Sequence, residues 1–262
     1  IGNVIGAGLG QAPATQIAAA AGLGFDIPCT LVNKVCASGM KAIMLGAQSI
    51  MLGDTHIAVA GGAENMSRGP FINPTQRFGQ RMGDAALVDM MVGALHDPFH
   101  SIHMGVTAEN VAAQFGITRE MQDALAVQSH NRAERATAEG RFKDQIVPVM
   151  LKSKKGEVAY TTDEHFRTGA KMEDFAKLKP VFVKENGTVT AGNASGINDG
   201  AAAVIIDCTL LGNVASQGGG GAASLSGSPL LVSCRFLGNQ CPICGSDGMY
   251  NRQSTATLVN CL

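Results

Sequence analysis

The fold is decided by residues 30–60, which contain three consecutive apolar segments: TLVNKV at 30–35, ASGMKAIMLGAQSIML at 37–52 and HIAVA at 56–60. The middle segment is long enough for a helix. Its apolar side chains spread around most of the circumference, which is typical of a buried helix. The two flanking runs predict buried strands. A strand, a helix and a strand at this spacing predict an α/β fold, with a parallel-rich sheet and buried helices.

Other segments extend this pattern along the chain. Residues from about 63 to 190 begin with weak periodicity, and we expect an inserted loop domain there, because long loops in compact proteins are often functional. Thr118 predicts a helix N-cap, with Glu120 in the first turn. The remaining expected elements are helices at 15–21, 107–115 and 118–140, a hairpin within 146–161, and strands at 188–191 and 201–206.

Composition excludes several classes of protein. The 262 residues include 20 basic and 21 acidic ones, so we expect neither a nucleic-acid partner nor binding to an anionic membrane. Hydrophobic residues make up 45% and charged residues 16%, which excludes a disordered chain. No apolar run predicts a membrane span, and no signal peptide is visible. Only Cys29 and Cys36 precede residue 208, which is typical of a reduced, cytoplasmic protein.

The last part of the chain differs from the rest. Five cysteines lie within 208–262, and the segment Cys208–Asn213 recurs as Cys234–Asn239. A third copy begins near Leu258. A repeat of about 26 residues with Gly-rich and Ser-rich turns predicts parallel β-helix coils. We therefore expect two domains, residues 1–206 and a short β-helix-like tail at 207–262.

Cys36 is the strongest candidate for chemistry. It lies between a predicted strand and a predicted helix, where the helix N-terminus would favour an anionic sulfur. The small residues Ala37, Ser38 and Gly39 would allow a substrate to approach. The alternative is an inert core cysteine, since free cysteines are among the most buried residues. Spacing alone does not separate the nucleophile from the core residue.

Five segments resemble the thiolases of the acetyl-CoA acetyltransferase type, and the resemblance runs from Ile1 to about Ile206. The segments that carry it are 35–42 (VCASGMKA), 60–67 (AGGAENMS), 103–110 (HMGVTAEN), 140–144 (GRFKD) and 187–200 (GTVTAGNASGINDG). The resemblance implies a thiolase-like N-terminal half. It also implies that Cys36 is a nucleophile, which attacks an acyl-CoA thioester and holds the acyl group.

The resemblance also implies a substrate site. The substrates would be acetyl-CoA or another acyl-CoA, with no resident cofactor and no metal. The residues that fall where the family contacts the acyl-pantetheine chain or coenzyme A are Leu95, His103, Met104, Arg167, Ala191, Ser195 and Ile197. Arg167 suits the phosphates because of its charge. Asp174 departs from the pattern, since some relatives have serine there.

The family completes its site with a second half that supplies an Asn, a His and another Cys, in the motifs Asn-Glu-Ala-Phe, Gly-His-Pro and Cys-x-Gly-Gly-Gly. None of these motifs occurs here, although Gly218–Gly221 is similar to the last one. We therefore expect an acyl-CoA C-acyltransferase that is catalytically incomplete in this chain. The family forms homo-oligomers, and an uncovered helix at 37–52 predicts association or aggregation.

Other interpretations stay open. The tail alone is typical of a non-enzymatic surface β-helix protein, and the change near Asp207 fits a thiolase half joined to unrelated repeats. Gly6, Gly8 and Gly10 weakly suggest a dinucleotide loop, but the G-x-G-x-x-G spacing is missing. The loop histidines at 96, 100 and 103 weakly suggest a metal. The pair Cys241 and Cys244 is half of a zinc motif, and a disulfide or stacked cysteines are alternatives.

Overall fold

The computed structural model describes residues 1–143, 146–154 and 156–206, together with short segments of the tail at 209–211, 222–224, 230–232, 235–237, 239–242, 249–251 and 257–259. The chain divides into two compact units, each built from segments that are distant in the sequence. Unit 1 consists of Ile1–Asn65, Phe142–Thr161 and Asp199–Leu262. Unit 2 consists of Met66–Arg141 and Thr162–Asn198.

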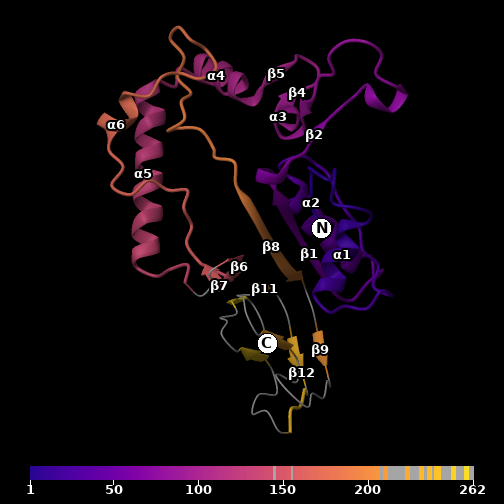
Figure 1. Cartoon of the computed structure of the whole chain (residues 1–262). Helices are drawn as coiled ribbons and strands as arrows, with labels where there is room; N and C mark the ends of the chain where they lie inside the picture. Colours follow the sequence, from indigo (N-terminus) through magenta and orange to yellow (C-terminus); the bar gives the residue numbers. More distant parts are fainter. Residues whose placement is uncertain are drawn as a thin grey trace. The chain divides into compact units, whose positions relative to one another are not determined.

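In its described residues, unit 1 contains two helices and the longest strands (Figure 1). Its helices are α1 (Pro13–Ala20) and α2 (Ser38–Met51). Its strands before the tail are β1 (Ala58–Asn65), β6 (Val149–Ser153), β7 (Gly156–Tyr160) and β8 (Asp199–Ile206). The tail contributes β9 (Thr209–Leu211), β10 (Ala222–Ser224), β11 (Leu230–Val232), β12 (Arg235–Leu237), β13 (Met249–Asn251) and β14 (Thr257–Val259).

The longest strand pair is antiparallel, while the other described pairings of the same sheet, β8 with β11 and β11 with β14, are parallel. β1 and β8 pair over their whole length, from Ala58 opposite Ile206 to Asn65 opposite Asp199. The chain leaves β1 at Asn65 and enters β8 at Asp199, so both ends of the intervening segment lie at the same end of the pair. An antiparallel arrangement follows from this connection. The expected strand at 201–206 exists, but its first half is exposed rather than buried.

Residues 30–35 do not form the expected strand. The first residues of the chain lie between this segment and β1, because Gly2 bridges to both Val32 and Gly62 in a parallel sense. The amide of Gly2 donates to the Gly61 carbonyl at 2.7 Å, and the amide of Val32 donates to the Ile1 carbonyl at 2.8 Å. Val35 then turns into the left-handed region, which ends any extended structure.

A glutamate on β1 fixes the start of the chain. The carboxylate of Glu64 accepts the backbone amides of Val4 and Ile5 at 2.8 and 3.0 Å. It also accepts the side-chain amide of Asn3 at 3.0 Å. These three donors come from one tight segment at the beginning of the chain. The carboxylate therefore ties the first strand-like segment to the end of β1.

The helix expected at 37–52 is present as α2, but it is not buried all round. Only Ser38 and Ala42 are buried, on the face that packs against β1. The opposite face exposes large apolar side chains, and Met40 and Met51 are 68% and 85% exposed. The apolar periodicity was therefore correct for the helix, and none of the described residues covers its second face, in agreement with the uncovered helix expected of a chain without the second half.

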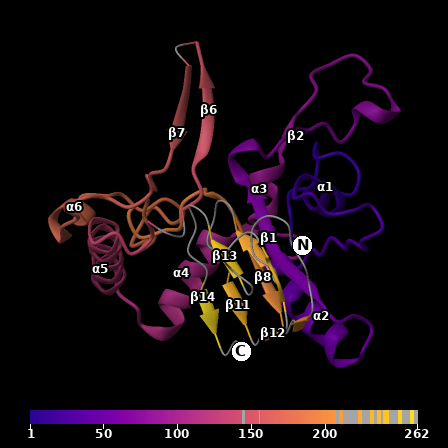
Figure 2. The ribbon, with the colours of Figure 1, turned by 90° about the horizontal axis from the view of Figure 1, so that it is seen from below.

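Parallel ladders join two described strands of the tail, β11 and β14, to β8, and the other described tail strands pair with one another. Figure 2 shows β8, β11 and β14 side by side in one sheet, and Val204 pairs with Leu230, which pairs with Thr257. Thr209 pairs with Arg235 in a second parallel ladder. The ladders thus pair equivalent places in successive copies of the sequence repeat. The predicted hairpin is confirmed as β6 and β7, and both of its strands are exposed. The domain boundary at 206 stays a prediction.

Unit 2 contains the short elements that precede the long helix α5 and the loops that follow it. Its helices are α3 (Met90–Ala94), α4 (Met104–Phe115), α5 (Arg119–Ala138) and α6 (Met172–Ala176), with short 3₁₀ turns at Met66–Arg68 and Gln76–Phe78. Its strands are β2 (Phe71–Ile72), β3 (Val88–Asp89), β4 (His96–Asp97) and β5 (Ile102–His103). The predicted cap is confirmed, because the Thr118 hydroxyl accepts the amide of Met121 at 3.2 Å.

The strand expected at 188–191 does not form, because a buried carboxylate accepts the backbone amides of this segment. Glu109, on α4, accepts the amides of Thr188 and Val189 at 2.8 Å each, and the Thr188 hydroxyl at 2.7 Å. These amides are the donors that a neighbouring strand would otherwise have used. Val189 and Thr190 are nevertheless buried. The apolar pattern therefore predicted the burial of this segment correctly and its secondary structure wrongly.

A second polar network supports the same segment. Asp123, 2% exposed on α5, pairs with Arg119 at 2.7 Å and accepts the side-chain amide of Asn193 at 2.9 Å. Asn193 in turn accepts the amide of Thr190 at 2.7 Å. Arg119 also donates to the carbonyls of Phe175 and Leu178. The buried charges of α5 are thus paired and hydrogen-bonded, as a buried ion pair requires.

Across the described part of the chain, no helix combines the length and the apolar character that crossing a membrane requires.

We predict that Glu109→Gln lowers the free energy of unfolding at pH 7 by about 2 kcal/mol, since charge-assisted hydrogen bonds are lost. Burial alone would raise the pKa of Glu109, but the hydrogen bonds from Val189 and Thr188 outweigh burial and hold the pKa below its ordinary value. Such a group stabilises the fold above its unfolded pKa, and this stabilisation is lost as the pH falls through the folded pKa. Urea titrations should therefore show the difference between wild type and variant shrinking below about pH 4.3.

Glu164→Gln is the matched control, because Glu164 lies in the same unit and is exposed. Equal destabilisation by the two substitutions would contradict the structural role given to Glu109.

Candidate active site

Cys36 lies in a tight turn just before α2. Its side chain is exposed, whereas Cys29 is half-buried. The preceding residue, Val35, has φ +49°, a left-handed conformation that is unfavourable for a β-branched side chain. Backbone strain of this kind persists only where the surroundings impose it, and it is concentrated at functional sites. The structure therefore excludes the interpretation of Cys36 as an enclosed core residue.

Ser38 holds the strained turn in place. Its hydroxyl accepts the amide of Lys34 at 2.9 Å and donates to the Val35 carbonyl at 2.5 Å. The Asn33 side chain accepts the amide of Val35 at 3.1 Å. Ser38 is 4% exposed, so it does not line an approach to the sulfur as its size suggested. Its function in this structure is to close the turn that presents Cys36.

Glycines bring the start of α2 against the sheet. A Cβ atom on Gly62 would lie 3.2 Å from the Cα of Gly39, and one on Gly2 would lie 2.4 Å from the Gly39 nitrogen. The start of α2 therefore lies so close to residues 2 and 62 that a side chain at Gly2 is excluded and one at Gly62 would be tight. A Cβ atom on Gly39 itself would make only ordinary contacts, 3.6 Å from Gly62. The motif residues 35–42 and 60–67 thus form one local structure in unit 1.

Three of the predicted contact residues come together in unit 2. Leu95 follows α3, and its carbonyl accepts the amide of Met104 at 2.9 Å. His103 precedes Met104 and caps α4, because its Nδ1 accepts the amide of Gly105 at 3.0 Å. Met104 is exposed, and Leu95 and His103 are half-buried. The segment 95–104 thus presents two apolar side chains beside an imidazole.

The imidazole of His103 is held by two other rings. It stacks on Phe182 with centroids 4.7 Å apart, and His96 meets it edge-on at 5.2 Å. Burial lowers the pKa of His103, and the charge of His96 lowers it further. The ring is therefore neutral near pH 7, and its Nδ1 acts as an acceptor. A Cβ on Gly105 would overlap the Phe182 ring, so glycine is required for the stacking.

The other four predicted contact residues lie on two exposed segments of unit 2. Arg167 lies on the loop before α6, and the remaining three, Ala191, Ser195 and Ile197, lie on the turn after Thr190. The polar network of Asn193 fixes this turn, and the Ala194 amide donates to the Thr190 carbonyl at 3.1 Å. Asp174 is exposed and pairs with Lys177 at 3.2 Å, so a cation offsets the charge of this departure from the pattern.

Cys36 belongs to unit 1, and the other predicted site residues belong to unit 2.

The three loop histidines that suggested a metal make other contacts. His96 and His103 face each other across β4 and β5, and His100 bonds to Asp97 at 2.6 Å. Among the described residues, no group of three or more His, Cys, Asp or Glu side chains is arranged to hold a metal. Cys241 is disulfide-bonded, while Cys244 lies outside the described residues.

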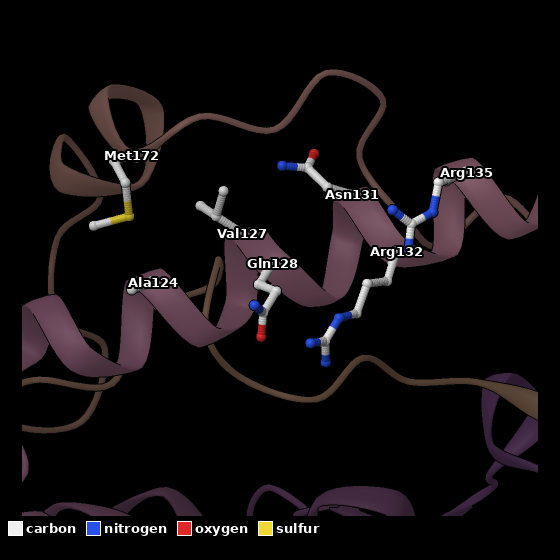
Figure 3. Close-up of a pocket in the computed structure, with 7 residues that line it drawn as sticks. All are labelled: Ala124, Val127, Gln128, Asn131, Arg132, Arg135 and Met172. Carbon is white, nitrogen blue, oxygen red and sulfur yellow. The ribbon is translucent and has the colours of Figure 1, made fainter.

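A separate pocket of about 520 Å³ lies along α5. Figure 3 shows its lining, which combines the apolar Val127 and Met172 with the cations Arg132 and Arg135. None of the predicted contact residues is part of this lining. The pocket is therefore an additional basic surface of unit 2.

Comparison with known proteins identifies the family. Residues 1–208 match the family model described as thiolase, N-terminal domain. The chain belongs to the thiolase family. A beta-ketothiolase, BktB of Cupriavidus necator, is 60% identical to this thiolase chain over 185 residues, which are 71% of the chain and 47% of the relative. An acetyl-CoA acetyltransferase of the same organism is 55% identical over 208 residues, covering 79% and 53%.

Solved structures agree with the sequence relatives. The crystal structure of the acetyl-CoA acetyltransferase of Bacillus anthracis superposes on this thiolase chain with a TM-score of 0.74 and 43% identity, covering 78% of the chain and 52% of the other protein. The thiolase-like α/β fold is thereby confirmed. The chain spans about half the length of the relatives that it matches.

Sequence reasoning missed the residues that support the site. Glu64 and Glu109 lie inside the motifs that carried the resemblance, and an acid among apolar and small residues was the available signal. His130 contacts the loop of Arg167, since its Nδ1 accepts the Arg167 amide at 3.0 Å. A histidine on a polar helix such as α5 gave no signal. The predicted roles of the contact residues in this thiolase chain stay predictions.

We predict that iodoacetamide modifies Cys36 faster than Cys29 in the folded chain, by at least about fivefold, because reaction with a thiol requires access to it. Peptide mass spectrometry after timed quenching measures both rates in one sample. Cys36→Ser should remove the fast site and leave the rate at Cys29 unchanged. In urea, where both thiols are accessible, we expect equal modification rates. Equal modification rates in the folded chain as well would show that the turn does not expose Cys36.

Proposed function

We propose that this chain carries the acyl-accepting part of an acyl-CoA C-acyltransferase of the acetyl-CoA acetyltransferase type. The observation that carries the proposal is the exposed Cys36 on a strained turn before α2, in a chain that is 60% identical to a beta-ketothiolase over 185 residues. An exposed sulfur on a turn held by Ser38 is accessible to an incoming thioester. The substrate proposed is acetyl-CoA or a similar acyl-CoA.

The proposed reaction forms and breaks one bond to the acyl carbon. The Cys36 thiolate attacks the thioester carbonyl, a new Sγ–acyl bond forms, and the bond between the acyl carbon and the coenzyme A sulfur breaks. Coenzyme A leaves as the thiolate and takes up a proton. Dividing acyl transfer in this way replaces one difficult step by two easier ones. No resident cofactor enters the proposal, since coenzyme A is part of the substrate.

The contact residues in the second unit provide the chemistry that the proposal requires for binding. The exposed guanidinium of Arg167 suits phosphate groups, and the apolar side chains of Leu95 and Met104 suit an aliphatic chain. His103 is neutral near pH 7 and has one ring nitrogen occupied by the Gly105 amide. These roles belong to the proposal, and the contacts that hold each residue support it.

We predict that incubation with radiolabelled acetyl-CoA places about one acetyl group per chain on Cys36, because attack on the thioester leaves the label on the sulfur. Labelled peptides are identified by mass spectrometry, and hydroxylamine should release the label because it cleaves thioesters. Cys29→Ser should be labelled like the wild type, while Cys36→Ser should not. Label on Cys29 alone, or none in a sample whose Cys36 reacts with iodoacetamide, would refute acylation by this chain.

We also propose that copies of this chain associate through the exposed face of α2. Met40, Met44 and Met51 are each at least half exposed on one helix, and an apolar surface of this kind favours association. We predict that size-exclusion chromatography with light scattering gives a mass above that of the monomer, and that Met40→Gln with Met51→Gln shifts the mass towards the monomer. A purely monomeric wild type would contradict the prediction. Met150→Gln on β6 is the control for an exposed methionine elsewhere.

For the tail we propose parallel β-helix coils, supported by parallel ladders that pair equivalent places in successive copies of the repeat. An experimental structure in which β11 lies between strands other than β8 and β14 would exclude them. For the thiolase part we propose the cytoplasm, which the free state of Cys29 and Cys36 supports, whereas the disulfide of Cys241 favours an oxidising compartment for the tail. Fractionation of cells would decide between the two.

A further inference from the structure

His130 lies on α5 between the two segments of unit 2 that carry Arg167 and the Ala191–Ile197 turn. Its Nδ1 accepts the backbone amide of Arg167 at 3.0 Å. The backbone of Gly192, the residue after Ala191, is among the groups that shift the pKa of His130, so the ring also lies near the Ala191–Ile197 turn. One imidazole therefore holds the Arg167 loop by a hydrogen bond and lies beside this turn, and both segments carry residues proposed to contact coenzyme A.

Neighbouring residues of α5 hold the Arg167 loop in the same way. The carboxylate of Glu134, one turn after His130, accepts the amide of Gly169 at 2.8 Å. The side chain of Asn131 donates to the Ala170 carbonyl at 3.3 Å. Gly169 has φ +65°, a turn conformation that favours glycine. The loop is thus attached to α5 through its backbone, which leaves the Arg167 side chain exposed and unrestricted by these contacts.

We propose that His130 is a positioning residue, which holds the Arg167 loop beside the Ala191–Ile197 turn in the arrangement that binds the phosphate-bearing part of coenzyme A. The proposal rests on the proposed function for its ligand. His130 acts through the backbone of the Arg167 loop, because its Nδ1 is occupied by the Arg167 amide. It is therefore distinct from Arg167, whose charge would meet the ligand directly.

The contact between His130 and Arg167 requires a neutral ring, since only an unprotonated Nδ1 accepts a hydrogen bond. The groups that face the ring are His165 with its centroid 6.3 Å away, Phe175 of α6 at 5.7 Å, and Arg167 itself. Burial lowers the pKa of His130, the charges of His165 and Arg167 lower it further, and the nearby backbone of Gly192 acts in the opposite direction.

The lowered pKa of His130 makes attachment of the loop depend on pH. When the loop is detached, His130 has a pKa nearer its ordinary value of about 6.5. Protons therefore bind the detached form more tightly than the attached form, and lowering the pH favours detachment. The loop should be attached at pH 7 and above, and it should detach progressively as the pH falls below about 6.5.

His130→Asn is the decisive variant. The side-chain oxygen of asparagine occupies nearly the place of Nδ1 and accepts a hydrogen bond at every pH of interest. His130→Ala removes the acceptor altogether. His100→Asn is the matched control, because His100 is an exposed histidine of the same unit that bonds to Asp97. Circular dichroism establishes that each variant is folded before any comparison.

Two readouts on the whole chain test the proposal. In ¹⁵N–¹H correlation spectra between pH 5 and 8, the Arg167 amide should titrate in the wild type and in His100→Asn but remain constant in His130→Asn. Coenzyme A affinity, measured calorimetrically, should fall about five- to tenfold in His130→Ala at pH 7, equivalent to one lost hydrogen bond. The ratio of the wild-type affinity to the His130→Asn affinity for coenzyme A should decrease as the pH is lowered. Titration of the ligand phosphate and of His165 affects both proteins equally, so it does not change this ratio.

The outcomes separate the two proposals. An Arg167 amide that titrates equally in wild type and His130→Asn would overturn the positioning role, and so would a pH-independent affinity ratio in chains that bind coenzyme A. If the amide follows His130 but the wild type does not bind coenzyme A at any pH, the proposed ligand fails. The positioning of the loop by His130 would then stand without it.

Discussion

Each unit depends on one carboxylate that accepts backbone amides from a distant segment. Glu109 gathers the amides of Thr188 and Val189 onto α4, and Glu64 gathers those of Val4 and Ile5 onto the end of β1. A carboxylate has enough lone pairs for several donors, so one side chain can end an irregular segment that lacks a partner strand. Loss of such a group would leave several amides unpaired at once, which costs more than the net value of the bonds themselves. The segment that leads into the Ala191–Ile197 turn can be irregular because Glu109 satisfies its backbone amides.

The start of α2 illustrates a second constraint, the distance between backbones. Gly2 and Gly62 allow their chain segments to approach the start of α2, because a methyl group would lie 2.4 Å from the Gly39 nitrogen at residue 2 and 3.2 Å from the Gly39 Cα at residue 62. The approach fixes where α2 begins and leaves the connection from Lys34 to Ser38 very short. Val35 accepts an unfavourable conformation in this short connection, and Cys36 is left on its outer side. The exposure of the sulfur therefore follows from glycine packing and from Ser38, rather than from small residues around the sulfur.

The sequence predicted elements best where local chemistry decides them. Thr118 capped α5 as expected, and the apolar run at 37–52 formed α2, because capping and helical periodicity act within a few residues. The segments at 30–35 and 188–191 were wrong as strands, because their hydrogen-bond partners are the first residues of the chain and Glu109, which no local pattern reveals. The antiparallel pairing of β1 and β8 depends on where the chain returns, which local periodicity does not report. Cys36 could be found from its motif, whereas His130 could not, since it acts through the backbone of other segments.

The two neighbours of β8 show how the sheet continues past residue 207, where the composition of the sequence changes. One edge of β8 pairs antiparallel with β1, and the other pairs parallel with β11. A parallel neighbour cannot follow through a tight turn, because the chain must first travel back along the length of the strand. The chain makes this return between Ile206 and Leu230, and nearly the same interval separates β11 from β14. The repeat length thus coincides with the length of a return path. Any repeat of that length whose apolar strand matches Val204–Ile206 can continue the sheet from the last strand of the thiolase segment, whatever its ancestry.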